Sequence, residues 1–204
     1  MTFVDGACVA CGFGTAYEAL CRADVSGRDV VLVTGMGPVG LAAGLMAGKL
    51  GSPLRIGMDV SPERLELATK LGAVDHVLPA GPDALEQILD LTGGHGCEVT
   101  LDASGAASAR LTALQATRHW GRAVMVGEGG RLELDVSPAL IHPQITLYGS
   151  WVTSTWRMAE LCQNLVRWNL HPEVTVTDRF ALDDVAKAYE LADSGVGGKV
   201  AVTM

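Results

Sequence analysis

The fold is decided by residues 30–51, VVLVTGMGPVGLAAGLMAGKLG. A β-branched strand pattern runs directly into Gly35, Gly37 and Gly40, and a helix pattern of small residues follows. A strand, a glycine-rich turn and a helix in this order form the phosphate-binding turn of dinucleotide-binding sheets. The stretch therefore predicts a turn of this type, with a dinucleotide as its ligand.

Each residue of the turn has its own expected task. Gly35 permits the tight turn off the strand, Gly37 lets the backbone approach a pyrophosphate, and Gly40 allows the helix to pack closely on the strand. Pro38 falls in the first turn of the helix, where a missing backbone N–H costs no hydrogen bond. Because the free N–H groups and positive dipole end of the helix favour an anion, we expect all four residues to bind cofactor.

Asp59 strengthens this prediction because it ends the next strand pattern, LRIGMD, about 20 residues beyond Gly40. An acidic residue at this distance accepts hydrogen bonds from the adenosine ribose hydroxyls. Its charge would repel the 2′-phosphate of NADP, so NAD is the expected cofactor. Arg64 follows on a predicted helix, where it either covers the adenine ribose or pairs with Glu63 or Glu66.

The same stretch also has features of a membrane span, because residues 30–48 are uncharged and Gly40, Gly44 and Gly48 repeat a GxxxG spacing. Glycines and a proline interrupt the run, and no second run of this kind exists. The spacing is better explained by a helix face that lies close on a sheet. We expect no membrane partner.

Composition excludes several classes of protein. The chain has 204 residues, 49% of them hydrophobic and 19% charged, as in globular proteins. Its net charge is −8 and no Lys/Arg cluster occurs, which argues against a nucleic-acid partner. The first basic residue is Arg22, so no targeting segment is indicated and a cytoplasmic location is expected. Five cysteines form an odd set and predict thiols or ligands rather than a disulfide framework.

Strand and helix patterns alternate over residues 1–150, which is typical of a parallel sheet with helices on both faces. Ser61 is the expected N-cap of one helix, Pro62 its first residue, and Gly72 follows its last turn. We predict an α/β fold with a Rossmann doubly wound parallel sheet, preceded by a linker helix. The predicted strands are 29–34, 54–59, 74–78, 97–104, 121–127 and 145–152, and the predicted helices are 14–24, 38–50, 62–71, 83–91 and 106–118.

The pattern changes over residues 151–204, which we predict to form a C-terminal α/β segment. It contains a helix at 158–168, a β-rich stretch at 174–180, a helix at 182–192 and a last strand at 199–204. The stretches 127–130 and 194–198 are loop-like.

Cys8 and Cys11 form a CxxC motif with several possible meanings. A four-thiolate zinc site needs a second pair, which is missing, and a thioredoxin-like motif needs its own βαβ unit. Half a zinc site, a redox pair and coincidence therefore remain open from the spacing alone.

A longer stretch, residues 7–41, resembles the linker and first nucleotide-binding strand of zinc-dependent medium-chain alcohol dehydrogenases. It reads ACVACGFGTAYEALCRADVSGRDVVLVTGMGPVGL, and later blocks such as MDVSPERLELATKLGA, EVTLDASG and ITLYGSW continue the resemblance in order. By this resemblance, Cys11 is a thiolate ligand of the catalytic zinc and Thr15 lines the pocket beside the nicotinamide. Cys8 has no such counterpart and is expected to be a small buried residue.

The resemblance also implies cofactor contacts along the rest of the chain. Val39 would back the nicotinamide, Arg64 would flank the adenosine, and Lys199 would reach the pyrophosphate. Val39 has an alternative role as a core residue, and Lys199 as an exposed lysine. The remaining positions implied are Val60 near the adenosine, Ser104 and Gly105 in the cleft, and Val126, Gly127, Ser150 and Val152 near the carboxamide.

The chain departs from the family pattern because the GroES-like catalytic domain, to which the C-terminal segment would belong, is not in the sequence. Catalytic zinc normally has three protein ligands, and Cys11 supplies one. The five histidines are scattered and form no paired-ligand motif: His76, His95, His119, His142 and His171. We therefore expect cofactor binding with little or no turnover by this chain alone.

Three functions are compatible with the sequence. The leading one is the NAD-binding portion of a zinc-dependent dehydrogenase that moves hydride between a secondary alcohol or polyol and NAD. The alternatives are a zinc-independent NADPH enone or quinone reductase, which Asp59 and Cys11 disfavour, and a noncatalytic dinucleotide-binding fragment. The apolar stretch 145–152 predicts a homodimer through edge strands. Trp151, Trp156 and Trp168 form either an association surface or a local core.

Overall fold

The structure is a computed structural model that describes residues 1–204. Its centre is a six-stranded sheet in the order β3-β2-β1-β4-β5-β6, with every neighbouring pair parallel. This is the doubly wound order of a Rossmann fold, in which the direction of winding reverses beside β1, and it confirms the predicted fold class. The strands are β1 Val31–Thr34, β2 Arg55–Asp59, β3 His76–Pro79, β4 Cys97–Asp102, β5 Thr117–Met125 and β6 Thr146–Gly149.

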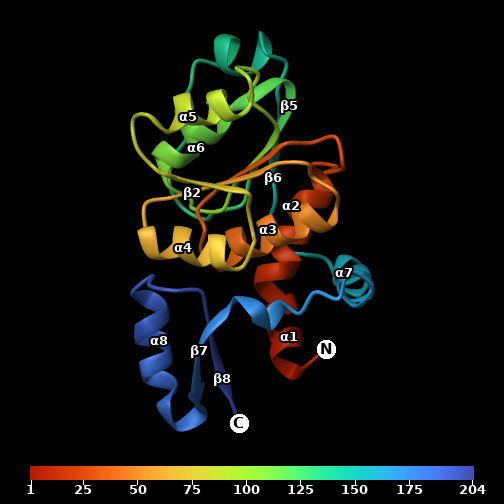
Figure 1. Cartoon of the computed structure of the whole chain (residues 1–204), viewed down its shortest axis with the longest axis vertical. Coiled ribbons are helices and arrows are strands. Elements are labelled where there is room, and N and C mark those ends of the chain that lie inside the picture. The colour runs from red at the N-terminus through yellow and green to blue at the C-terminus, as the bar shows by residue number, and fades with distance from the viewer.

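Helices cover both faces of the sheet, as Figure 1 shows. Because side chains alternate along a strand, Val31 and Val33 of β1 point into the larger core while Leu32 points into the smaller one. The larger core is closed by α2 Gly14–Arg22, α3 Pro38–Lys49, α4 Pro62–Lys70 and α7 Thr155–Trp168, and the smaller by α5 Ala84–Leu91 and α6 Ala107–Gln115.

Local signals placed most of these elements correctly. The Ser61 hydroxyl accepts a hydrogen bond from the Arg64 amide, Pro62 is the first residue of α4, and Gly72 follows it with a φ of +61°. The predicted helix 106–118 was too long, because the chain leaves α6 after Gln115. Thr117 already pairs with Cys97 in the sheet.

The N-terminal region contains more helix than the sequence predicted. The helix α1 Phe3–Cys8 passes into a π-helical turn, η1 Val9–Phe13, and then into α2. The CxxC motif is therefore helical. Such π-turns inside helices occur frequently at functional sites.

The C-terminal segment contains α7, the short helices η3 Pro172–Thr175 and η4 Leu182–Asp184, the strands β7 Val176–Ala181 and β8 Lys199–Thr203, and α8 Val185–Asp193. Strands β7 and β8 form a separate two-stranded parallel sheet. Figure 1 shows this sheet, α8 and α1 together at one end of the molecule, with both termini. Leu161 and Leu165 of α7 belong to the larger core, where α7 packs on α2 and η1.

None of the helices combines the length and the apolar character that crossing a membrane requires. The glycine face of α3 instead packs closely on its neighbours. A Cβ atom added at Gly44 would lie 2.6 Å from the carbonyl oxygen of Ala73.

Candidate functional site

The turn after β1 needs glycine at two positions for the fold itself. Gly35 has a φ of +90°, in the left-handed region, and an added Cβ would lie 2.8 Å from the Ser104 amide nitrogen. At Gly40 an added Cβ would lie 1.8 Å from the carbonyl oxygen of Gly35. The turn and the start of α3 therefore touch backbone to backbone, as predicted for these two glycines.

Gly37 differs because the protein's own packing does not require it to be glycine. Its φ is −69°, and an added Cβ would have the Arg64 guanidinium as its nearest neighbour, at 3.7 Å. Gly37 is the N-cap of α3 and Pro38 its first residue, with no side chain capping the free N–H groups. The first turn of α3 thus offers backbone donors and a positive dipole end to an anion.

Asp59 connects the end of β2 to this turn. Only 5% of its surface is exposed, and its Oδ2 accepts a 2.6 Å hydrogen bond from the Met36 amide. Its Oδ1 accepts a bond from the Ser61 amide at 2.9 Å, and the Nη1 of Arg64 lies 3.9 Å from Oδ2. The Asp59 carboxylate therefore fixes the glycine turn through the Met36 amide, and it lies close to the Arg64 guanidinium.

These residues surround a cleft of about 400 Å³, the size of a small-ligand pocket. The cleft lies at the carboxyl ends of β1, β2 and β4, where the winding of the sheet reverses and doubly wound folds bind ligands. The predicted cofactor residues that line it are Gly35, Gly37, Pro38, Val39, Asp59, Val60, Arg64 and Ser104. Residues that line it without having been predicted are Met58, Ala80, Ala103, Ala106, Ser108 and Ala109.

Several predicted residues lie at the same edge of the sheet but do not line this cleft: Gly105, Val126, Gly127, Ser150 and Val152. The amides of Val126 and Gly127 both donate to the Asp102 carbonyl at 2.9 Å. The Ser150 amide donates to the Met125 carbonyl at 3.0 Å. These positions lie at the carboxyl edge of the sheet beyond β4 and outside the cleft. Their contact with a cofactor stays a prediction.

Lys199 is not among the residues that line the cleft, so its contact with a pyrophosphate stays a prediction. It begins β8 and pairs with Val176 in the small sheet. It lines a different cavity of about 710 Å³, together with Thr2, Phe3 and Met204. The small sheet directs it there because β8 is registered on β7 rather than on the Rossmann sheet.

Asp102 is a second acidic residue that organises the carboxyl edge of the sheet. It is fully buried at the end of β4. It accepts hydrogen bonds from the Thr34 hydroxyl at 3.0 Å, the Ser104 hydroxyl at 2.6 Å, the Gly105 amide at 3.1 Å and the Arg110 Nε at 3.2 Å. The sequence signal was present, because Asp102 ends a strand before Ala-Ser, as Asp59 ends its strand before Val-Ser.

The predicted zinc ligand and the predicted nicotinamide residue lie on the N-terminal helix. Cys11 is exposed within η1, whereas Cys8 is buried, as expected, and burial raises the pKa of its thiol. Thr15 is 8% exposed, and its Oγ1 is buried without a hydrogen-bond partner.

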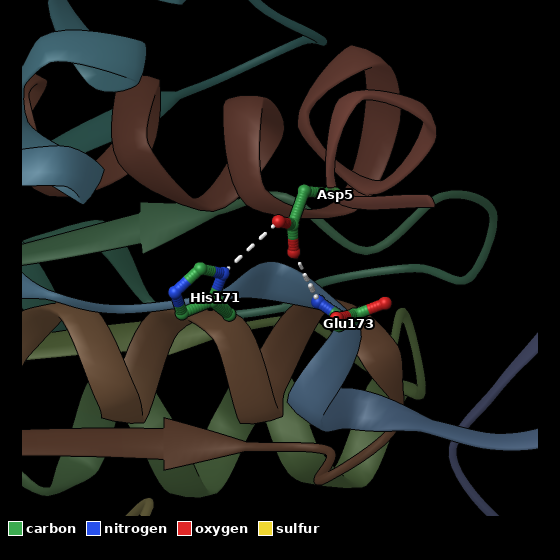
Figure 2. Close-up of side chains that lie close together, drawn as sticks. All are labelled: Asp5, His171 and Glu173. Carbon is green, nitrogen blue, oxygen red and sulfur yellow. Dashed lines mark hydrogen bonds and ion pairs between the residues drawn. The ribbon is translucent and has the colours of Figure 1, made fainter. Parts of the chain in front are cut away.

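One group in the chain brings together three side chains with potential metal ligands, and Cys11 is not in it. Figure 2 shows this group, Asp5 of α1 with His171 and Glu173. The Nδ1 of His171 lies 3.1 Å from Asp5 Oδ2, and the Glu173 amide donates to Asp5 Oδ1 at 3.0 Å. Sequence reasoning treated His171 as isolated and did not find this contact between the two ends of the chain.

Both carboxylates of the group have partners in the protein. Asp5 also accepts a hydrogen bond from the Thr2 amide at 2.9 Å, and Glu173 receives the Arg179 guanidinium at 3.1 Å. Burial alone would raise the pKa of Asp5, but hydrogen bonds from the Glu173 and Thr2 amides and from His171 outweigh it and lower that pKa. The group therefore acts as a latch that fastens α1 to η3. Cys11 is not a member of this group, so the zinc ligand set that the resemblance implies, with Cys11 in it, is not the group that the structure brings together.

The sequence model of the zinc-binding dehydrogenase family matches residues 38–168. The uncharacterized zinc-type alcohol dehydrogenase-like protein YphC of Escherichia coli (strain K12) is 46% identical over 203 residues, which cover 99% of this chain and 57% of that protein. An L-threonine 3-dehydrogenase of Symbiobacterium thermophilum is 33% identical over 92% of this chain and 54% of its own length. The crystal structure of an alcohol dehydrogenase from Thermotoga maritima superposes with a TM-score of 0.88 at 25% identity, covering all of this chain and 58% of that one. The chain thus spans little more than half the length of these relatives.

Proposed function

Because the chain belongs to the zinc-binding dehydrogenase family, we propose that it is the NAD-binding part of a dehydrogenase that transfers hydride between a secondary alcohol or polyol and NAD. The observation that carries the proposal is Gly37. Its missing side chain is not required by the protein's packing, yet it keeps open a cleft at the bare N-terminus of α3. This is the space that a pyrophosphate needs in order to reach the backbone amides.

The residues around the cleft fit a dinucleotide in both charge and hydrogen bonding. The first turn of α3 would bind the pyrophosphate, and Val39 would lie against the nicotinamide half. Each carboxylate oxygen of Asp59 accepts one backbone hydrogen bond and keeps a further lone pair for a ribose hydroxyl. NAD, when bound, supplies the hydride acceptor.

Asp59 also favours NAD over NADP. Its buried carboxylate faces the expected ribose position, and a 2′-phosphate there would be repelled. Arg64 does not reverse this preference, because its guanidinium already lies beside Asp59. The alternative, an NADPH-dependent enone or quinone reductase, lacks support from this charge arrangement.

Cys11 is the one catalytic zinc ligand that the family resemblance places in this chain, and it lies outside the group of Asp5, His171 and Glu173. A catalytic zinc has three protein ligands, and one thiolate does not supply them. We expect this chain alone to bind NAD with little or no turnover, and zinc-dependent oxidation of a secondary alcohol by it would contradict that. A noncatalytic dinucleotide-binding role is the second candidate, favoured by the same isolation of Cys11.

The proposal includes a homodimer paired through β6. This strand is an outer strand of the sheet and exposes Leu147. An apolar edge strand with free backbone groups favours pairing with a second copy. Sedimentation would test this, with the dimer expected for the wild type and a monomer for Leu147→Lys.

Substituting Gly37 tests the proposed site. We expect Gly37→Ala to unfold at the wild-type temperature and to lose NADH binding, because the added methyl enters the cleft rather than the core. Gly81→Ala is a matched control, since an added Cβ there meets nothing within 4 Å and the residue is outside the cleft. Unchanged NADH affinity in Gly37→Ala would overturn the proposed site.

A further inference from the structure

The segment 194–198 joins α8 to β8 and lies against the helix α4, as Figure 1 shows. Two glycines of the segment make this contact. A Cβ added to Gly195 would lie 3.4 Å from Arg64 Nη2, and one added to Gly198 would lie 3.1 Å from Leu67 Cδ2. The small C-terminal sheet is therefore connected, through this segment, to a helix that borders the cleft.

The backbone of the segment is fixed by its own hydrogen bonds. Ser194 Oγ accepts a hydrogen bond from the Val196 amide at 3.3 Å, and the Gly198 amide donates to Thr177 Oγ1 of β7 at 3.0 Å. Gly195 lies between these bonds with a φ of +70°, a conformation that glycine adopts most readily. Gly195 is therefore held in place from both sides.

The Arg64 side chain lies between this segment and the glycine turn. Its guanidinium is the nearest neighbour of a Cβ added to Gly37, at 3.7 Å, and Gly37 is the N-cap of α3. Only 25% of the Arg64 side chain is exposed. Arg64 thus reaches from Gly195 to the position where the pyrophosphate is expected.

The Arg64 guanidinium has a donor that the protein does not use. Its Nε is buried without a hydrogen-bond partner, and its Nη1 lies 3.9 Å from Asp59 Oδ2, beyond hydrogen-bond distance. Arg110, at the same edge of the sheet, instead donates to Asp102 at 3.2 Å. Because buried donors are nearly always hydrogen-bonded, the free donor of Arg64 indicates an acceptor from a ligand. A guanidinium is well suited to phosphate oxygens.

We propose that Arg64 donates to the pyrophosphate of the cofactor, and that Gly195 is a positioning residue that holds Arg64 there. The proposal rests on the proposed function, because it needs a dinucleotide in the cleft. Arg64 lines the cleft, whereas no residue of 194–198 does. The C-terminal segment therefore acts on the cofactor through Arg64.

A charged side chain at position 195 tests the proposal. Asn and Asp have nearly the same size, and both tolerate the left-handed backbone. In Gly195→Asp the carboxylate competes with the pyrophosphate for Arg64, and in Gly195→Asn no charge does so. We expect Gly195→Asp to bind NADH about tenfold more weakly than Gly195→Asn in a fluorescence titration, the effect of a charged hydrogen bond. A merely structural role of Gly195 affects both variants equally, so equal affinities would overturn the proposal.

The difference between the two variants should require Arg64. We expect it to fall below about twofold in an Arg64→Ala background, because charges without direct contact are screened by salt. A difference that persists there would overturn the proposed contact. Gly94 provides the control, since its φ is +81°, an added Cβ meets nothing within 4 Å, and it precedes β4 at the opposite edge of the sheet. Gly94→Asp and Gly94→Asn should bind NADH equally.

Adenosine distinguishes a phosphate contact from a nucleoside contact, because it lacks the phosphates. We expect adenosine, measured by competition with NADH, to bind Gly195→Asp and Gly195→Asn equally. A loss for adenosine as large as the loss for NADH would place Arg64 at the nucleoside and overturn the phosphate assignment.

A stability measurement tests the contact without any cofactor. We expect Gly195→Asp to resist urea better than Gly195→Asn, because the carboxylate pairs with Arg64, and to lose this advantage in the Arg64→Ala background. Independent effects of the two positions would overturn the contact. If the wild type does not bind NADH, the proposed function fails, and this comparison still judges whether the segment 194–198 holds Arg64.

Discussion

The Asp59 carboxylate accepts a 2.6 Å hydrogen bond from the Met36 amide, in the middle of the glycine turn. The Asp59 side chain thus fixes the turn that is expected to bind a phosphate. The same side chain lies where a ribose is expected. Because the two tasks use different lone pairs, they can be separated by substitution.

Asp59→Asn should shift cofactor preference and also lower stability. The amide oxygen can still accept from Met36, but the Ser61 amide then faces an NH2 group and loses its acceptor, a loss of about 1–3 kcal/mol. The negative charge that repels a 2′-phosphate is lost as well. We expect NADH to weaken by about tenfold, the effect of a charged hydrogen bond, while NADPH binding improves relative to NADH. Calorimetric titration checks this, with Asp83→Asn at the exposed start of α5 as the control. An unchanged NADH to NADPH ratio would contradict the assignment.

Asp5→Ala should destabilise the latch between α1 and η3. The substitution removes a fully buried carboxylate and leaves the Glu173 and Thr2 amides without their acceptor, a loss of about 1–3 kcal/mol in the free energy of unfolding at pH 7. Urea denaturation measures it, and Asp90→Ala on the exposed side of α5 is the control.

The stability that Asp5 contributes should also depend on pH in one direction. Its folded pKa lies below its usual value, so the contribution is complete above the unfolded pKa, near 4, and is lost as the pH falls through the folded pKa. The wild type and Asp5→Ala should therefore converge in stability in acid. A gap that widens in acid would contradict this account.

Asp102→Ala should have the larger effect on stability. It leaves the mostly buried Arg110 guanidinium without its carboxylate and frees the turn at Ser104, so we expect a loss of about 3–5 kcal/mol. The control is Glu133→Ala, whose partner Arg131 is exposed and whose loss should change stability by less than about 0.5 kcal/mol. Thermal unfolding measures the loss of stability in each variant. Equal losses for Asp102→Ala and Glu133→Ala would mean that Asp102 does not hold the turn at Ser104 in place.

Zinc should not stabilise this chain through Cys11, because one thiolate does not make a zinc site. We expect no rise in melting temperature with equimolar zinc and no difference between the wild type and Cys11→Ser. A rise that Cys11→Ser abolishes would reveal ligands that the structure does not bring together. A rise that His171→Ala abolishes would instead show that the latch binds the metal.

The central part of the fold could be predicted because its signals are local. The glycine turn, the Ser61 cap and the alternation of strands and helices each depend on residues within one turn or one βα unit. Gly35 and Gly40 were assigned their roles from spacing alone, and the structure gives each the close contact that the role requires.

The remainder depends on contacts between distant segments. Asp5 and His171 are 166 residues apart in sequence, and no periodicity marks their contact. The end of α6 was misplaced because pairing of Thr117 with Cys97 overrides local helix propensity. Lys199 begins β8, whose pairing with β7 no local pattern reveals, and its contact with the cofactor stays a prediction.

The most direct test of the account is calorimetric titration of the wild-type chain with NADH and, separately, with NADPH. We expect saturable NADH binding at one site per chain, at least about tenfold tighter than NADPH because Asp59 faces the 2′ position. Binding of neither nucleotide, or NADPH binding as tight as NADH binding, would contradict it.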